Sequence, residues 1–220
     1  MEQRNPAGEI TSRTELKDGL PHGQTTNFGP GGKPAMQATY MAGVLNGMTR
    51  LWDEKGNLVQ EANYKNGKQQ GLTRVYGGGK LLAEQMFAGG LLNGETVFFS
   101  EAGVPTSKLQ FKAGEIEGEA IFLHEGSIVR RAIYRKGLLE GESIDYDREG
   151  TKVQTAVYKA NLLDGWLRRY WPNGQVMEEL RYSKGKPEGA PRRFNSKGAA
   201  QATEASQASL MERLEKLVRG

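Results

Sequence analysis

Side chains that could do catalysis or hold a metal are few and scattered in this sequence. The two histidines, His22 and His124, lie in distant parts of the chain, and the chain has no cysteine. A two-histidine metal site, a thiolate site and a Ser-His-Asp set are therefore unsupported. Each histidine is interpreted as a solvated residue rather than a ligand.

The carboxylates and the glycine-rich stretches give no catalytic signal either. A general acid–base pair needs two carboxyl groups within several ångströms beside a cleft. Most carboxylates fall instead in expected turns, well separated along the chain: Glu115, Glu117, Glu140, Asp164 and Glu188. The stretches "GPGGK" at 29–33 and "GGGK" at 77–80 lack the Gly-Lys-Ser/Thr ending of a phosphate-binding loop. The sequence predicts a protein that is not an enzyme and that holds no metal or cofactor.

The composition of the chain limits the kinds of partner that we expect. The 220 residues carry a formal net charge of +4, with 25% charged and 37% hydrophobic residues. This mild basicity permits acidic partners or anionic membrane surfaces, but it is too weak to indicate nucleic acid. No apolar run approaches the ~20 residues of a membrane span, and the first residues lack the apolar core of a secretory signal. We expect a periplasmic protein if an export signal has been removed, and a cytoplasmic one otherwise.

The strongest signal is an internal repeat of about 23–24 residues. Each copy reads aromatic, x-x-Gly, x-x-x-Gly, four residues, aromatic, and then a third Gly. The first aromatic position holds Leu16, Tyr40, Tyr64, Phe87, Phe111, Tyr134, Tyr158 and Tyr182. The second holds Phe28, Trp52, Tyr76, Phe99, Leu123, Tyr146, Tyr170 and Phe194. Eight copies in one register predict a repeat architecture.

The glycine columns indicate turns. The second glycine occurs in every copy: Gly23, Gly47, Gly71, Gly94, Gly118, Gly141, Gly165 and Gly189. Asn161 replaces the first glycine once, and Asn is the residue that best tolerates a left-handed backbone after Gly. We therefore expect positive φ in that column, with Asn66 and Gly67 forming a hairpin turn.

Each copy should thus contain two turns and two short strands, in which alternate residues share a face. The aromatics and their small neighbours would form a thin core that is buried only when the copies stack. The predicted fold is all-β: an elongated antiparallel β-hairpin repeat sheet of eight units, followed by a short C-terminal α-helix.

The pattern "YKNGKQQGLTRVY…GGGKL" resembles the variant MORN repeats of bacterial proteins of the YwqK-family antitoxin type. The resemblance covers residues 16–198, with Leu16 and Leu123 departing at aromatic positions. It implies repetitive antiparallel β structure without an active site. It also implies an antitoxin or immunity protein, encoded beside interbacterial effectors that include secreted lipases and phospholipases.

The two ends differ from the repeats. Residues 1–15 are polar, and we expect them to be flexible. Residues 199–220 read as a linker and an amphipathic helix, with Leu210, Leu214 and Leu217 on one face and a Ser209–Glu212 capping box. That helix would either cap the last hairpin or bind a partner.

Three surface features are candidates for partner binding. Apolar residues stand between the first two glycines where the repeat is usually polar: Val44, Leu91, Leu138 and Leu162. They would form a hydrophobic stripe or pack on adjacent turns. An arginine follows the second glycine by three residues at Arg50, Arg74, Arg168 and Arg192, and it would bind a partner or cover the sheet.

The third feature is the segment "GWLRRYWPNG". It brings together Trp166, Arg168, Arg169, Tyr170 and Trp171. Binding hot spots favour Trp, Tyr and Arg, so this segment is the predicted hot spot.

The leading hypothesis is an antitoxin that binds and neutralises a cognate secreted toxin, with a type VI lipase or phospholipase effector as the preferred partner. The alternative is a membrane-associated scaffold, because MORN repeats are often linked to phospholipid binding. A purely structural repeat module is the third possibility.

Overall fold

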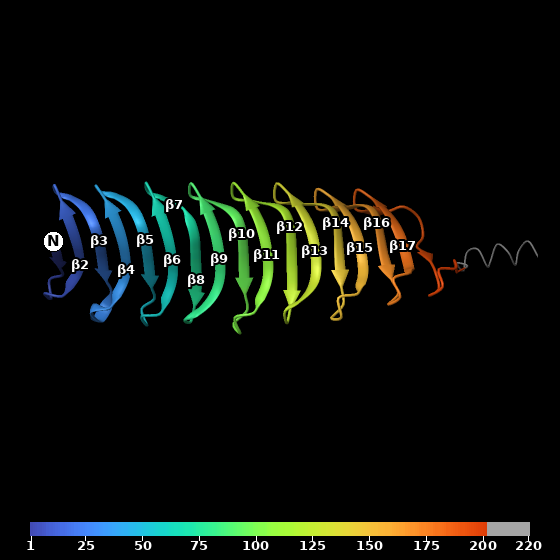
Figure 1. Cartoon of the computed structure of the whole chain (residues 1–220), viewed down its shortest axis with the longest axis horizontal. Coiled ribbons are helices and arrows are strands. Elements are labelled where there is room, and N and C mark those ends of the chain that lie inside the picture. Colours follow the sequence, from blue (N-terminus) through green and yellow to red (C-terminus); the bar gives the residue numbers. More distant parts are fainter. Residues whose placement is uncertain (202–220) are drawn as a thin grey trace, which may run out of the picture. The chain divides into compact units, whose positions relative to one another are not determined.

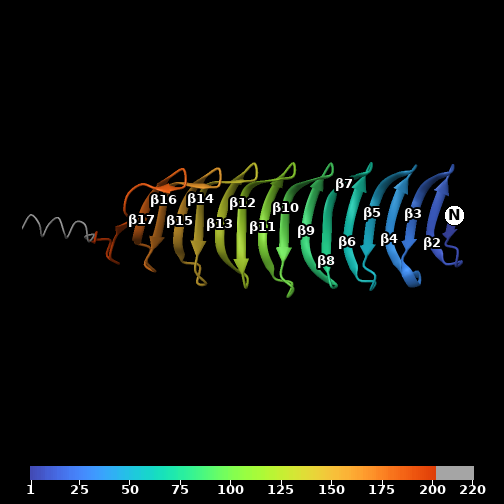
Figure 2. The same cartoon turned by 180° about the vertical axis from the view of Figure 1, so that it is seen from behind.

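The computed structural model describes residues 1–201, which fall into two compact units. The first unit comprises Met1–Gly118, and the described part of the second comprises residues 119–201. Within each unit, most strands that are consecutive in sequence are hydrogen-bonded neighbours in an antiparallel sheet (Figures 1 and 2).

The strands of the first unit are β1 (Glu2–Arg4), β2 (Ile10–Lys17), β3 (Leu20–Phe28), β4 (Pro34–Met41), β5 (Val44–Trp52), β6 (Leu58–Lys65), β7 (Lys68–Gln69), β8 (Gly71–Gly77), β9 (Lys80–Ala88), β10 (Leu91–Phe99) and β11 (Pro105–Lys112). A 3₁₀ turn, η1 (Pro30–Gly32), joins β3 to β4. Strand β12 (Glu115–His124) contains the boundary between the units. The second unit continues with β13 (Ser127–Arg135), β14 (Leu138–Tyr146), β15 (Lys152–Lys159), β16 (Leu162–Tyr170), β17 (Val176–Ser183), β18 (Lys186–Pro187) and β19 (Arg192–Arg193).

The first glycine column forms two-residue hairpin turns with positive φ at both central residues. Asn66 and Gly67 have φ of 51° and 76°, and Ala160 and Asn161 have φ of 49° and 68°. These values match a type I′ turn. The inference drawn from Asn161 is therefore confirmed.

Gly47 and Gly165 of the second glycine column lie inside β5 and β16, at bulges where the register with the preceding strand shifts. Gly165 has φ of 139°, and a Cβ at this position would lie 2.8 Å from Val157 Cβ on the paired strand. Gly47 has φ of 127°, and a Cβ there would lie 2.9 Å from Thr39 Cβ. Only glycine combines this backbone conformation with such close approach.

The two aromatic columns lie on opposite faces of the sheet. The first aromatic shares a face with the residue two before it, as Tyr40 does with Ala38, and we call this face A of each unit. The second aromatic shares face B with the arginine two before it. The hydroxyl of Tyr76, for example, donates a hydrogen bond to Glu61. Glu61 lies directly opposite Arg74 on the neighbouring strand.

The core is thin. Its buried apolar residues are alanines: Ala38, Ala62, Ala83, Ala120, Ala132 and Ala156. The largest fully buried side chains are those of Thr73 and Thr96. Half-buried aromatics cover this small-residue layer, so neighbouring copies, rather than any one hairpin, supply the burial.

The predicted all-β antiparallel repeat sheet matches each unit, but the predicted helix requires a correction. Residues 1–201 contain no α-helix. At the start of the expected linker, Ala200 forms an antiparallel bridge with Phe194, because Asn195 closes the same turn that ends the earlier copies. The remainder of the predicted segment, with Ser209, Glu212 and the three leucines, lies outside the described residues.

Residues 1–15, expected to be flexible, instead contain β1 and most of β2. The Asn5 side chain accepts a hydrogen bond from the Glu9 amide at 2.9 Å, as Asp53 does from Asn57 at 2.8 Å. The segment "NPAGE" at 5–9 therefore forms the same turn as "DEKGN" at 53–57. It lies about half a repeat before Leu16. This signal is visible in the sequence and extends the repeat towards the N-terminus.

Candidate functional site

The predicted arginine column lies on face B and is paired with glutamates directly opposite on the next strand. Nitrogen–oxygen distances are 2.8 Å for Arg50–Glu61, 2.9 Å for Arg74–Glu84 and 3.1 Å for Arg168–Glu179. The hydrogen bond from Arg50 holds the pKa of Glu61 below its ordinary value. Such pairs hold strands in register, so pairing alone does not single out a partner site.

The predicted hot spot is divided between the two faces. Trp166, Arg168 and Tyr170 alternate along β16 on face B, whereas Arg169 lies on face A. Trp171 belongs to the following turn, where its indole N–H donates to the Phe194 carbonyl at 3.1 Å. The structure thus brings three of the five predicted residues together and gives Trp171 a contact between copies.

Face B of the second unit gathers cations over aromatic rings. The guanidinium carbons of Arg168 and Arg181 lie 5.2 and 6.0 Å from the Trp166 ring centroid. The ammonium of Lys152 lies 4.0 Å from the centroid of Tyr170. Beside β17, Arg192 lies 5.5 Å from the centroid of Phe194.

Acidic groups on this face are already neutralised by arginines. Glu179 is only 9% exposed, and both Arg168 and Arg192 contact its carboxylate at 3.1 Å. Arg131 donates to Glu119 at 2.8 Å, and this bond raises the pKa of Arg131. Arg181 contacts Glu188 through Nε at 3.1 Å, and Lys152 lies over the ring of Tyr170, so the face has a basic, aromatic character.

The apolar turn residues are exposed but lie against the next turn of the same unit. Val44, Leu91 and Leu162 are 46%, 52% and 50% exposed. A Cβ built at Gly67 would lie 3.7 Å from Val44 Cγ1, and one at Gly185 would lie 3.6 Å from Leu162 Cδ2. Leu138 is 41% exposed at the equivalent place. The side chains therefore pack over the neighbouring glycines and leave one side open.

Sequence reasoning missed a polar row on face A of the second unit. Its members pair directly across successive strands: Arg130, Asp145, Gln154, Arg169, Glu178 and Arg193. Arg130 donates two hydrogen bonds to Asp145, and Gln154 donates to the same carboxylate at 3.2 Å. The sequence did contain a signal for this row. Charged residues recur four positions before the first aromatic and four positions after the second glycine of these copies.

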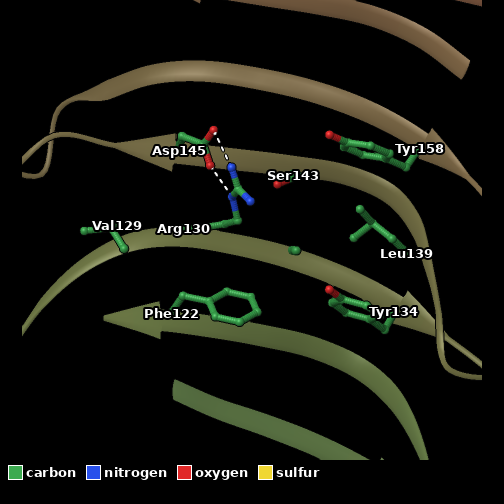
Figure 3. A pocket seen from close by; sticks show the side chains of 9 residues that line it. Phe122, Val129, Arg130, Tyr134, Leu139, Ser143, Asp145 and Tyr158 are labelled. Carbon is green, nitrogen blue, oxygen red and sulfur yellow. Dashed lines mark hydrogen bonds and ion pairs between the residues drawn. The ribbon is translucent and has the colours of Figure 1, made fainter. Parts of the chain in front are cut away.

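A pocket of about 400 Å³ opens beside the first pair of this row (Figure 3). Arg130 and Asp145 form one end, and the rings of Tyr134 and Tyr158 lie at the other, next to Leu139. Its remaining lining residues are Phe122, Val129, Ala132 and Ser143. The bonds to Asp145 raise the pKa of Arg130.

The histidines do not join these sites. His22 accepts a hydrogen bond from the Ala42 amide through Nδ1 at 3.3 Å, which links one turn to the next. His124 is exposed at the end of β12. Residues 1–201 hold no cluster of three or more potential metal ligands, and no helix in this part is long and apolar enough to cross a membrane.

The fold and its surface define a repeat-based binding scaffold, and the family comparison agrees with this class. A family model described as a MORN repeat variant matches residues 45–66 and 163–184. The two matches have the same register, from the second residue of a strand to the following turn, and one lies in each unit. The comparison therefore supplies the repeat type.

No curated protein matches the chain. A crystal structure of TarM is similar over 54% of this chain and 20% of its own, with 12% identity and a TM-score of 0.26. A Bacteroides fragilis protein with unknown function aligns over 84% of this chain and 95% of its own, with 11% identity and a TM-score of 0.11. The chain spans about a fifth of TarM, and neither likeness bears on function.

Proposed function

We propose that this chain is a non-enzymatic antitoxin that binds and neutralises a secreted protein toxin. The preferred partner is a type VI lipase or phospholipase effector. The matched repeats supply the scaffold class, and the antitoxin assignment rests on the resemblance of the glycine and aromatic columns to YwqK-family proteins. The toxin would bind on face B of the second unit.

The observation that carries this proposal is the position of Trp166 between Arg168 and Arg181. Stacking on an aromatic ring holds a guanidinium in place, and a preorganised side chain loses less entropy on binding. Glu179 already has two arginine partners, and Arg181 contacts Glu188 through Nε at 3.1 Å. The terminal N–H groups of Arg181, whose side chain is 62% exposed, are therefore the donors that a partner's carboxylate would contact. The surface therefore suits a protein with an acidic patch.

The test is co-expression with the effector encoded next to this chain's gene, followed by purification of the complex and a growth assay. We expect a stable complex and rescue of growth. Replacing Trp166 with Ala should weaken binding by at least about tenfold, as hot-spot truncation does. The association rate should fall as salt is raised.

Matched controls come from the first unit. Met48 occupies the same repeat position as Trp166 and is 41% exposed, and Arg50 corresponds to Arg168. Met48→Ala and Arg50→Ala should leave the affinity unchanged. Absence of a complex would refute the antitoxin proposal, whereas equal losses for Met48→Ala and Trp166→Ala would move the site away from face B of the second unit.

The membrane scaffold is tested with the same variants. Vesicles containing anionic phospholipid are mixed with the chain and floated on a density gradient. Salt-sensitive flotation that Trp166→Ala removes, together with no effector complex, would favour the lipid-binding alternative.

A further inference from the structure

The two-residue hairpin turns of the first unit follow one another along one edge of its sheet (Figure 1). The residue after each turn glycine lies against the glycine of the next turn. A Cβ built at Gly43 would lie 3.7 Å from Leu20 Cδ2, and one built at Gly114 would lie 3.8 Å from Leu91 Cδ2. These side chains form a regular series with one member per copy, which we call the turn row: Leu20, Val44, Lys68 and Leu91.

The apolar members of the turn row are not needed to form the turns. Leu20 is 49% exposed and Leu91 is 52% exposed. Lys68 follows Asn66 and Gly67, whose φ values are 51° and 76°, and Val44 follows Ala42 and Gly43, whose values are 47° and 80°. Because a lysine and a valine follow the same backbone, the apolar side chains indicate a contact with another molecule.

The same turns carry an excess of positive charge. Lysines in these turns are Lys17, Lys65, Lys68 and Lys112, and the carboxylates are Asp18 and Glu115. None of the four lysines forms an ion pair within residues 1–201. The nearby Glu15 carboxylate accepts a hydrogen bond from the Gln24 amide at 3.0 Å, so it serves the backbone. The row therefore favours an acidic partner with an apolar surface.

The spacing of the turn row matches that of an α-helix with a seven-residue repeat. Successive turns are two strands apart, which corresponds to about 9.6 Å. Seven residues of α-helix rise by about 10.5 Å. A helix lying along the row would thus bring one side chain per heptad to each turn.

We propose that the turn row binds an acidic amphipathic α-helix of a partner protein. The helix would place apolar side chains against Leu20, Val44 and Leu91, and a carboxylate against Lys68. A lipid surface would receive Lys68 at the same depth as the apolar side chains, whereas a helix can place a carboxylate at that one position. The position of Lys68 within the row therefore favours the helix.

The test uses fluorescently labelled synthetic peptides of four heptads, with Ala and Glu at the other positions as helix formers. In the first peptide, the contact position holds Leu in heptads one, two and four and Glu in heptad three. A second peptide has the reverse order, because the helix could run in either direction. A third has Leu in all four heptads. We expect saturable binding of the full chain to the first or second peptide by fluorescence anisotropy, and weaker binding as salt is raised.

Leu91→Lys introduces the side chain that the third copy already holds at this position. It should weaken binding of the preferred peptide at least about tenfold, as truncation of a central contact does. Val104 is 37% exposed in a turn at the opposite edge of the same unit, so Val104→Lys is the matched control and should change nothing.

Lys68→Leu tests the position of the carboxylate. The wild-type chain should prefer the peptide with one contact Glu, and Lys68→Leu should reverse this preference in favour of the all-Leu peptide. An unchanged preference would overturn the proposed alignment of the helix, and equal losses for Leu91→Lys and Val104→Lys would overturn the site.

Failure of both peptide orders to bind would overturn the proposal. Flotation on anionic vesicles that Leu91→Lys removes, without peptide binding, would assign the row to a lipid surface instead. A dimer in light scattering that Leu91→Lys dissociates, without peptide binding, would assign it to a second copy of this chain. The inference goes beyond the antitoxin proposal and uses residues of the first unit, so either can fail while the other stands.

Discussion

The two units differ in the side chains of one row on face A, which is uncharged in the first unit and mostly charged in the second. In the first unit the row carries no charge, and its members pair across successive strands: Ser12, Asn27, Met36, Leu51, Gln60, Val75, Ala83, Phe98 and Ser107. In the second unit the corresponding row is Arg130, Asp145, Gln154, Arg169, Glu178 and Arg193. The strands around the two rows have equivalent pairing and equivalent bulges.

This difference shows which side chains the sheet needs in order to form and which it does not need. Because Leu51 and Asp145 occupy equivalent positions, an ion pair at that place is not needed to form the sheet. Cross-strand ion pairs contribute only ~0.2–1 kcal/mol each. The polar row of the second unit is therefore better explained by recognition than by stability.

The largest effect should come from the second-glycine column, and it should be equal in both units. Gly165→Ala and Gly47→Ala place a Cβ within 2.8 and 2.9 Å of the facing Cβ at positive φ. Each should lower the free energy of unfolding by about 2–4 kcal/mol, measured by urea denaturation.

Gly150→Ala is the control for this column. Its φ is 82°, but no atom lies within 4 Å of the new Cβ, so only the backbone term of ~1 kcal/mol should remain. Equal losses at Gly150 and Gly165 would show that close approach across the bulge does not matter.

The reciprocal exchange of the two rows should give a smaller and unequal pair of effects. Leu51→Asp places a carboxylate between Met36 and Gln60 without a cation, and should cost about 2–3 kcal/mol. Asp145→Leu leaves Arg130, whose side chain is 52% exposed, to be hydrated, and should cost about 1 kcal/mol. Denaturation midpoints of both variants measure the difference. If Asp145→Leu proved the more harmful, the polar row would be a stabilising element after all.

Sequence reasoning found the parts of the fold that depend on backbone constraint. Glycine spacing and the substitution at Asn161 predicted the turns, because few residues tolerate positive φ. The bulge at Gly165 was not foreseen, since the close approach of Val157 depends on the register of another strand. The turn at Asn5 was visible but was read as part of a polar end.

Site prediction from sequence succeeded less well, for a geometric reason. The segment "GWLRRYWPNG" is contiguous, but alternation sends Trp166 and Arg169 to opposite faces. The pocket, by contrast, joins Arg130 to Tyr158 across three strands. Its residues are ordinary one by one, and only the register of the sheet brings them together.

The pH dependence of Glu61 should sharpen the comparison on face B, where ionic pairs occur in both units. The hydrogen bond from Arg50 lowers the pKa of Glu61 below 4.5. Its stabilisation is therefore present above the unfolded pKa and is lost as pH falls through the lower folded value. An NMR titration of the carboxyl carbon should show the midpoint moving up towards 4.5 in Arg50→Ala. A midpoint that stays in place would remove the role given to Arg50.

The smallest effect should come from Arg193, at the end of the polar row. Its side chain is 64% exposed, and Glu178 keeps Arg169 at 3.5 Å when Arg193 is removed. Arg193→Ala should therefore change the free energy of unfolding by about 0.5 kcal/mol or less, and screening at 1 M salt should abolish the difference. Arg130→Ala, which deprives Asp145 of two hydrogen bonds, should exceed it at every salt concentration. A loss at Arg193 as large as that at Arg130 would mean that the row acts as one cooperative stabilising element along its whole length, and the explanation of the row by recognition would fail.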